Sequence, residues 1–261
     1  MKVRAKKALG QHFLKDLDIA KKIAQTIETT QLPDEAKKWG DLPVLEVGPG
    51  MGVLSQFLME SGREVKAVEL DSESVEFLRK VFPKLDVVEG DFLKMDLSDI
   101  FKTEFTLIGN YPYNISSQIF FKVLDYKEKI PVVAGMLQKE VAQRICSGPG
   151  SKVYGILSVL LQAWYDCDYL FDVAPGVFSP PPKVTSGVIR LIRNSRASLG
   201  CDERLFKTIV KTSFGQRRKT LRNSLASLIP VNSPVWQDSI LSRRPETLSV
   251  EEFINITNQL S

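Results

Sequence analysis

The amino-acid sequence predicts an α/β protein in which a doubly wound, mostly parallel sheet of seven strands is followed by a small helical domain. Three observations support this fold class. Short apolar runs alternate with amphipathic stretches between residues 43 and 137, and a glycine-rich turn follows the first run. Beyond residue 196, apolar residues recur at helical spacing without a strand-like run. The 261 residues, 43% apolar and 25% charged, are enough to bury such a core.

The predicted elements follow in chain order. Parallel neighbours in a sheet need crossover connections, so each apolar run predicts a strand and each amphipathic stretch after it a helix. Two β-rich segments joined by the proline-rich residues 175–182 suit an antiparallel edge that completes the sheet. The expected strands cover residues 44–47, 65–69, 85–88, 105–108, 132–137, 165–173 and 184–192, and the expected helices include residues near 54–58, 75–81, 203–229 and 248–260. We expect one domain over residues 1–196, with a basic first segment 1–22, and a second over residues 197–261.

Histidine and cysteine usage excludes several kinds of chemistry. The chain has one histidine, His12, and three widely separated cysteines, Cys146, Cys167 and Cys201. This inventory argues against a disulfide framework, a CxxC zinc site and a multi-histidine metal cluster, so we expect no metal. The N-terminus is basic and lacks an apolar segment, and no apolar run approaches the roughly 20 residues that span a bilayer. We therefore expect a cytoplasmic protein without a membrane partner.

The charge is distributed unevenly. Residues 1–22 carry a net charge of +5, residues 183–222 carry +9, and the remaining residues carry −10. Two basic segments on an acidic body suggest a polyanionic partner, although solubilising surface charge is an alternative explanation. A basic cluster lies between Phe214 and Leu225. The apolar residues Phe214, Leu221 and Leu225 have helical spacing, so they can pack on one face of a helix while the cations point outward. The members of the cluster are Arg217, Arg218, Lys219 and Arg222.

The glycine-rich turn after the first strand is a candidate cofactor site. It contains Gly48, Gly50 and Gly52, and glycines let the backbone turn tightly and approach a ligand at the carboxyl edge of the sheet. The spacing is GxGxG rather than GxGxxG, which favours a nucleoside-type cofactor over a bound pyrophosphate. A purely structural turn is the alternative.

Acidic residues at the ends of the next two strands support the nucleoside interpretation. Glu69 ends the second strand, 21 residues after Gly48, where a carboxylate can accept hydrogen bonds from both ribose hydroxyls. Asp91 ends the third strand, where it can accept a hydrogen bond from an adenine amino group. Phe92 offers an apolar contact to the same ring.

The segment Asn110-Tyr111-Pro112-Tyr113, after the fourth strand, suggests the reaction. An amino group conjugated to a base is a poor nucleophile because its lone pair is delocalised. The Asn110 side-chain oxygen and the carbonyl of Tyr111 or Pro112 can each accept one amino hydrogen and direct the nitrogen lone pair at an electrophile. Pro112 fixes the backbone and Tyr113 can stack on the base. A loop with turn-forming residues is the alternative.

Taken in order and spacing, these motifs resemble the KsgA/RsmA family of small-subunit rRNA adenine dimethyltransferases over nearly the whole chain. The resemblance extends to four further segments. These are Gly10–Leu14, the proline-rich Phe178–Val184, Phe214–Asn223 and Arg244–Leu248.

The resemblance implies a Rossmann-like class I methyltransferase catalytic domain that uses S-adenosylmethionine, and a helical rRNA-binding domain. It implies a cofactor contact for His12 and Leu14, a second base-stacking role for Phe178, and an rRNA-facing role for the basic cluster. The implied substrate is two adjacent adenosines near the 3′ end of small-subunit rRNA, each methylated twice on N6 within a 30S assembly intermediate. We expect a monomer.

Two residues depart from the family pattern. His12 stands where the family more often has Asn, and Tyr111 stands where it more often has Leu. His12 can still contact the cofactor through a backbone or ring atom, and Tyr111 presents its backbone carbonyl whatever its side chain.

Three other functions stay open at this point. The first is a large-subunit rRNA adenine methyltransferase of the antibiotic-resistance type. The amino-acid sequences of the Phe178–Val184 loop and of the basic cluster disfavour this alternative. The second is a DNA adenine methyltransferase, which no sequence-reading domain supports. The third is a non-catalytic ribosome assembly factor, against which the intact glycines, Glu69, Asp91 and Asn110 argue.

Overall fold

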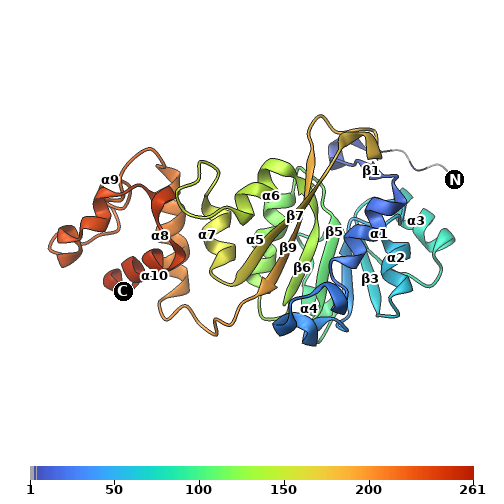
Figure 1. Ribbon diagram of the computed structural model, residues 1–261, viewed down its shortest axis with the longest axis horizontal. Coiled ribbons are helices and arrows are strands. Elements are labelled where there is room, and N and C mark those ends of the chain that lie inside the picture. The colour runs from blue at the N-terminus through green and yellow to red at the C-terminus, as the bar shows by residue number, and fades with distance from the viewer. Residues whose placement is uncertain (1–2, 4) are drawn as a thin grey trace. The chain divides into compact units, whose positions relative to one another are not determined.

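The computed structural model describes residue 3 and residues 5–261 (Figure 1). Lys2 and Arg4, two cations of the predicted basic N-terminal segment, lie outside the described residues. The chain divides into two compact units. The sheet unit extends to Ala142 and includes Asp166–Arg193, and the helical unit comprises Gln143–Tyr165 and Asn194–Ser261. The sequence analysis placed residues 143–165 with the first domain, and its boundary after residue 196 stays a prediction.

The sheet unit contains a seven-stranded sheet of order β4-β3-β2-β5-β6-β9-β7 (Figure 1). Strands β2 to β6 pair in parallel, and β9 pairs antiparallel with β6. The predicted fold class is therefore confirmed, with the antiparallel strand β9 next to the edge strand β7. The strands are β1 Phe13–Leu14, β2 Val44–Val47, β3 Val65–Glu69, β4 Asp86–Glu89, β5 Thr106–Asn110, β6 Val132–Gln138, β7 Tyr165–Val173, β8 Phe178–Ser179 and β9 Ser186–Arg193.

The helices between the strands form as their apolar spacing predicts. Asp16 begins α1, because its carboxylate accepts hydrogen bonds from the backbone N–H groups of Asp18 and Ile19, and Asp71 begins α3 in the same way. The α-helices are α1 Leu17–Gln25, α2 Ser55–Glu60, α3 Ser72–Val81, α4 Leu97–Ile100, α5 Ser116–Asp125, α6 Lys139–Cys146, α7 Ile156–Gln162, α8 Glu203–Gly215, α9 Leu221–Ser224 and α10 Val250–Leu260. The 3-10 helices are η1 Lys7–Leu9, η2 Thr29–Gln31, η3 Asp34–Trp39, η4 Pro175–Val177, η5 Pro234–Gln237, η6 Ser239–Ser242 and η7 Pro245–Thr247.

One face of the sheet packs on α1, α2 and α3. Ile23 of α1, Leu58 of α2 and Leu78 of α3 are fully or almost fully buried against sheet residues such as Ala67 and Ala134. Because side chains alternate along a strand, the intervening residues face the other side of the sheet. These two packed faces leave the carboxyl ends of the parallel strands as the open edge of the sheet.

The helical unit is built from α7 to α10 and short 3-10 turns. Phe214 of α8 packs between Tyr154 and Phe253, with ring centroids 6.1 and 6.0 Å away. A capping box between Ser249 and Glu252 begins α10. The expected helix over residues 203–229 is interrupted, because α8 ends at Gly215 and α9 begins only at Leu221.

No helix within the described part of the chain combines the length and apolar character needed to cross a membrane.

Candidate active site

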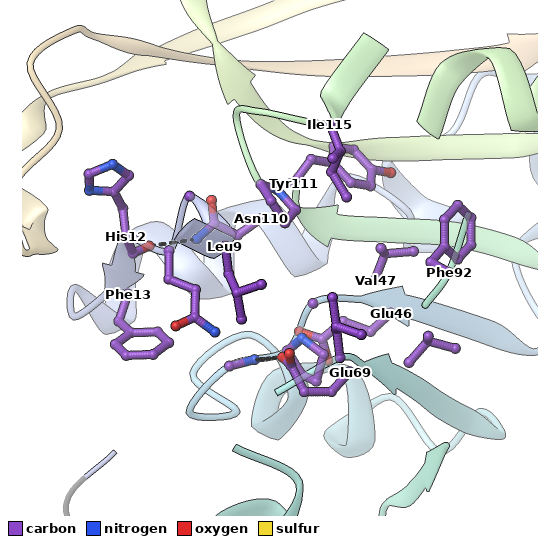
Figure 2. Close-up of a pocket in the computed structure, with 18 of the residues that line it drawn as sticks. Leu9, His12, Phe13, Glu46, Val47, Glu69, Phe92, Asn110, Tyr111 and Ile115 are labelled. Atoms are coloured by element: carbon purple, nitrogen blue, oxygen red, sulfur yellow. Dashed lines mark hydrogen bonds between the residues drawn. The ribbon is translucent and has the colours of Figure 1, made fainter. Parts of the chain in front are cut away.

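A cavity lies at the carboxyl edge of the sheet, where β2, β3, β4 and β5 end (Figure 2). Leu9, His12 and Phe13, from the segment before α1, also line this cavity. The cavity brings together most of the residues that the sequence predicted as functional. These are His12, Leu14, Gly48, Gly50, Glu69, Asp91, Phe92, Asn110, Pro112 and Tyr113.

The glycine loop forms the floor of the cavity. Gly48 and Gly50 have φ values of +67° and +56°, which side chains rarely tolerate. A Cβ atom at Gly50 would lie 2.9 Å from the Phe13 ring, so a larger residue would also collide with the segment that covers the loop. The Gly50 N–H donates to Oε2 of Glu69 at 3.0 Å. The loop is thus held directly to the carboxylate at the end of β3.

Glu69 links this loop to the start of α3. Its Oε1 accepts a hydrogen bond from the Asp71 N–H at 2.9 Å, while its side chain is buried. Burial raises the pKa of Glu69, and the backbone hydrogen bonds oppose that shift. Each carboxylate oxygen has more than one acceptor position, so both oxygens can still accept hydrogen bonds from the hydroxyls of a ribose.

Asp91 and Phe92 follow β4 and form the next wall of the cavity. Oδ1 of Asp91 accepts from the Leu93 N–H at 3.0 Å, and Oδ2 lies 3.5 Å from Nζ of Lys94. The Phe92 ring is 4% exposed. An acceptor and an apolar ring are therefore adjacent at the same edge, which suits an aromatic base that carries an amino group.

Asn110 ends β5 with a side-chain amide of fixed orientation. Its Nδ2 donates to the backbone carbonyl of His12 at 3.1 Å, which leaves Oδ1 as the acceptor that faces the cavity (Figure 2). Nδ1 of His12 is 2.8 Å from the carbonyl oxygen of Pro180. Because a carbonyl only accepts, this nitrogen carries the hydrogen.

Tyr113 is held from two sides. Its ring centroid lies 5.4 Å from that of His12, with 33° between the planes, and its hydroxyl lies 2.5 Å from Oγ of Ser186 at the start of β9. Burial raises the pKa of Tyr113, against the effect of the Ser186 hydrogen bond. The ring is thus fixed next to Asn110 and Pro112.

Tyr111 turns its side chain away from the cavity and into the core. Its hydroxyl donates to the Ala134 carbonyl at 2.7 Å, and its ring makes an edge-on contact with Phe120. A Cβ atom on Gly135 would lie 2.7 Å from the ring, and one on Gly109 would lie 3.1 Å away. Two cross-strand glycines therefore make the space that this larger residue occupies. Burial also raises the Tyr111 pKa.

Glu46 is a buried carboxyl group in the cavity wall. It is 1% exposed and accepts a hydrogen bond from Oγ of Ser55 at 2.6 Å. Burial raises its pKa to about 8, and the nearby Glu69 adds to this effect. Glu46 is therefore mostly protonated at neutral pH. The neutral form is favoured because a buried negative charge beside the Glu69 carboxylate would be unfavourable.

Phe178 does not join the other predicted residues. It pairs with Leu14 in the small β1–β8 ribbon and is 1% exposed, within the core cluster of the sheet unit. It is not one of the described residues that line the cavity. This geometry gives the ring no open face for a base, so its stacking role stays a prediction that the structure does not support.

The predicted basic cluster lies in the helical unit, in and after the turn that follows α8. Arg218, Lys219 and Arg222 are exposed. Arg217 instead donates to the carbonyls of Ser151 and Lys152, at 3.4 and 2.6 Å. Two members of the cluster thus have structural partners, since Arg222 also donates to the Trp236 carbonyl at 2.8 Å and lies over its ring.

Sequence reasoning missed several residues around the cavity. Ser186 holds Tyr113, and Ser55 holds Glu46. Lys6 and Gln11 bind Asp71, which ties the N-terminal segment to the start of α3. Each of these contacts joins segments far apart in the chain or depends on side-chain direction, so no local pattern indicates them. For Ser186, the adjacent proline-rich motif was the only available signal.

The strand order, together with the cavity at the carboxyl edge of the sheet, defines a Rossmann-like class I methyltransferase. Within that class, the chain belongs to the ribosomal RNA adenine dimethylase family, whose model matches residues 2–261. It is 60% identical over 257 residues to ribosomal RNA small subunit methyltransferase A of Parabacteroides distasonis, covering 98% of this chain and 93% of that protein.

Two solved structures share the fold. A dimethyladenosine transferase from Plasmodium falciparum superposes with a TM-score of 0.75 at 24% identity, covering 94% of this chain and 96% of that one. The 23S rRNA methyltransferase ErmE superposes with a TM-score of 0.66 at 25% identity, covering 94% and 99%. The similarity thus extends over both compact units.

Proposed function

We propose that this protein transfers methyl groups from S-adenosylmethionine to the N6 amines of two adjacent adenosines near the 3′ end of small-subunit rRNA. The products are N6,N6-dimethyladenosines, formed in the cytoplasm on a 30S assembly intermediate. The observation that carries the proposal is the Asn110 amide, whose nitrogen is bound to the His12 carbonyl and whose oxygen faces the cavity. The 60% identity to a protein named for small-subunit rRNA methylation supports this choice of substrate.

The cavity residues fit the proposed cofactor. Glycines at positive φ leave the floor without side chains, and a Cβ atom on Gly48 would point toward Pro112 at 3.7 Å. Glu69 would hold the ribose hydroxyls, Asp91 and Phe92 the adenine, and His12 and Leu14 the methionine part. When bound, S-adenosylmethionine supplies an electrophilic methyl group on a positively charged sulfur. We propose no metal ion in the reaction, because this donor carries its own reactivity.

The residues of the motif then act on the target amine. Oδ1 of Asn110 accepts one amino hydrogen, and the carbonyl of Tyr111 or Pro112 accepts the other. These two acceptors draw the lone pair out of conjugation with the ring and direct it at the methyl group. The N–CH₃ bond would form as the S–CH₃ bond breaks, with S-adenosylhomocysteine as the neutral leaving group, and the methylated amine would lose one proton to water. The target base is taken out of its stack and lies against Tyr113. For the second transfer the monomethylated amine keeps one hydrogen, so one acceptor is enough to orient it.

The helical unit binds the RNA backbone in this proposal. Arg218 and Lys219 are exposed at the end of α8, where they can neutralise phosphates without losing structural contacts. The sequence motifs in this unit match those of the small-subunit enzymes. We propose that a single copy of the chain acts on each assembly intermediate.

Methylation of defined RNA substrates tests this function. The protein is incubated with labelled S-adenosylmethionine and undermethylated 30S subunits, and the modified bases are mapped. We expect label in two adjacent adenosines near the 3′ end of the small-subunit rRNA. Label in large-subunit rRNA would favour the alternative exemplified by ErmE. Cofactor binding without transfer to either RNA would indicate a non-catalytic assembly factor.

A further inference from the structure

Lys122 connects the helix after the catalytic motif to the wall of the cavity. It lies in α5, and its ammonium group donates to the carbonyl of Leu93 at 3.1 Å and to the carbonyl of Met95. The same group lies 5.5 Å from the centroid of the Phe92 ring. All three contacts are to the loop Asp91–Met95, which follows β4 and contains the acceptor and the apolar ring of the cavity wall.

The surroundings of Lys122 differ from those of a solvated surface lysine. The side chain is half-buried, and burial lowers its pKa, while the nearby carboxylates of Asp91, Asp96 and Asp125 oppose that shift. An ammonium group has three donors and no acceptor, and two of these donors are used by carbonyls of one loop. Removing the ammonium would leave both carbonyls without this partner.

Lys122 gives this loop a long-range anchor, whereas the hydrogen bonds that Asp91 accepts are local. Asp91 accepts hydrogen bonds from backbone groups only two to four residues further along the loop. Farther on, Tyr126 of α5 donates to Asp96 at 3.0 Å and accepts from the Leu97 N–H at 3.3 Å. Tyr126 thus fixes the end of the segment, and Lys122 fixes the part beside Phe92. The two residues lie four positions apart on α5, and therefore on one face of the helix.

We propose that Lys122 is a positioning residue that sets the preference of the cofactor site for adenine. It holds the loop so that Asp91 accepts from the exocyclic amino group and Phe92 lies against the ring. The inference rests on the proposed function, because it requires that Asp91 and Phe92 bind the adenine of the cofactor. Lys122 contacts the loop and not the ligand, so its removal changes selectivity through the position of Asp91.

Calorimetric titration with the cofactor product and an analogue of it tests this role. The probes are S-adenosylhomocysteine and S-inosylhomocysteine, in which an oxygen replaces the amino group that Asp91 would bind. For the wild-type chain we expect the adenine compound to bind about tenfold more tightly or better, because a site built to bind an amino group rejects the analogue without it. In Lys122→Met the Kd for S-adenosylhomocysteine should rise about tenfold, and the preference should fall toward one.

Three further variants complete the experiment. Lys122→Arg, which keeps donors for both carbonyls, should recover most of the preference. Lys129→Met is the matched control, because Lys129 donates to Ser98 at 3.0 Å and does not contact the loop Asp91–Met95. It should leave both Kd values unchanged. Asp91→Asn should lower the preference as Lys122→Met does. The amide oxygen keeps the hydrogen bond from the Leu93 N–H, and the NH₂ group, a donor, replaces the other carboxylate oxygen that would accept from the adenine amino group.

The outcomes separate the inference from the function on which it rests. An unchanged preference in Lys122→Met would overturn the inference, whether both Kd values stay the same or rise equally with a lower melting temperature. An unchanged preference in Asp91→Asn would overturn the adenine assignment and, with it, the role of Lys122. Failure of the wild-type chain to bind S-adenosylhomocysteine would overturn the proposed function itself.

Discussion

The side-chain amide of Asn110 donates its hydrogen to the backbone carbonyl of His12, across 98 residues of chain. This contact decides which end of the amide faces the cavity, because the carbonyl can only accept and therefore selects the nitrogen. The segment before α1 thus orients the group that we propose to bind the target amine. The side chain of His12 is itself fixed through Pro180 and Tyr113.

Two substitutions of Asn110 separate its acceptor role from its donor role. Asn110→Ala removes both and should lower the single-turnover rate of methyl transfer by about 100-fold or more, similar to the loss of one oxyanion-hole donor. Asn110→Asp keeps an acceptor but places a carboxylate oxygen against the His12 carbonyl, so we expect a comparable loss. Titration with S-adenosylhomocysteine distinguishes lost chemistry from lost cofactor binding. A wild-type rate in Asn110→Asp would show that the His12 contact does not orient the amide.

Tyr111 should contribute to stability more than to catalysis. Tyr111→Leu leaves space over Gly109 and Gly135, so the free energy of unfolding should fall by about 2 to 4 kcal/mol. Tyr111→Phe loses only the hydrogen bond to Ala134 and should cost about 1 kcal/mol. Methyl transfer by folded protein should stay within a few-fold of wild type in both, because the proposed acceptor is a backbone carbonyl. Denaturant unfolding and single-turnover assays measure the two quantities. A loss of activity in either Tyr111 variant as large as in Asn110→Ala would contradict the prediction that Tyr111 contributes mainly to stability.

The central strands β2, β5 and β6 were predictable because they are buried on both faces and therefore read as continuous apolar runs. The run Val44–Val47 is a strand with the predicted bounds. The predicted bounds are also those of β3 and β7. The other long strands differ by one or two residues at one or both ends, as for β9, which begins at Ser186 where it pairs with Gln138. The two-residue strands β1 and β8 have no periodicity to detect. Their pairing buries Phe178, which the sequence analysis placed against the target base.

The cavity residues were predictable where they follow a strand, since parallel strands place their carboxyl ends at one edge. Their supporting partners were not predictable in this way. Ser186, Lys122 and the His12 carbonyl act through contacts between distant segments, and no spacing rule reports such contacts. The turn Gln216–Thr220 was missed for a different reason. The apolar residues Phe214, Leu221 and Leu225 keep a helical spacing across it, although the backbone does not.

Glu46 should make stability depend on pH. Its pKa is about 8 in the folded chain and near 4.5 when exposed, so between these values the folded chain holds a proton that the unfolded chain has lost. The free energy of unfolding therefore falls as pH rises from about 4.5 to about 8. Glu46→Gln mimics the protonated group and should have a stability close to wild type at pH 5 and a higher one at pH 9, by a few kcal/mol at most.

Thermal unfolding at both pH values measures this difference. Glu60→Gln is the matched control, because Glu60 is exposed at the end of α2 and its replacement should give no pH-dependent difference. Equal melting temperatures for Glu46→Gln and wild type at pH 9 would mean that the buried carboxylate is not destabilising, which would contradict the assigned cause.

The basic cluster should separate into structural and RNA-binding members. Arg217→Ala removes hydrogen bonds to the carbonyls of Ser151 and Lys152 and should lower the stability of the helical unit by about 1 to 2 kcal/mol.

The double variant Arg218→Ala/Lys219→Ala removes exposed charges and should leave the melting temperature unchanged. Its affinity for small-subunit rRNA should fall, and the slope of log K against log salt should become shallower by about 2, because two phosphate contacts are lost. Filter binding at several salt concentrations measures the slope, with the exposed pair Lys80→Ala/Lys84→Ala of the sheet unit as a charge-matched control. An equal change in both pairs would indicate a general charge effect and argue against phosphate contacts at the end of α8.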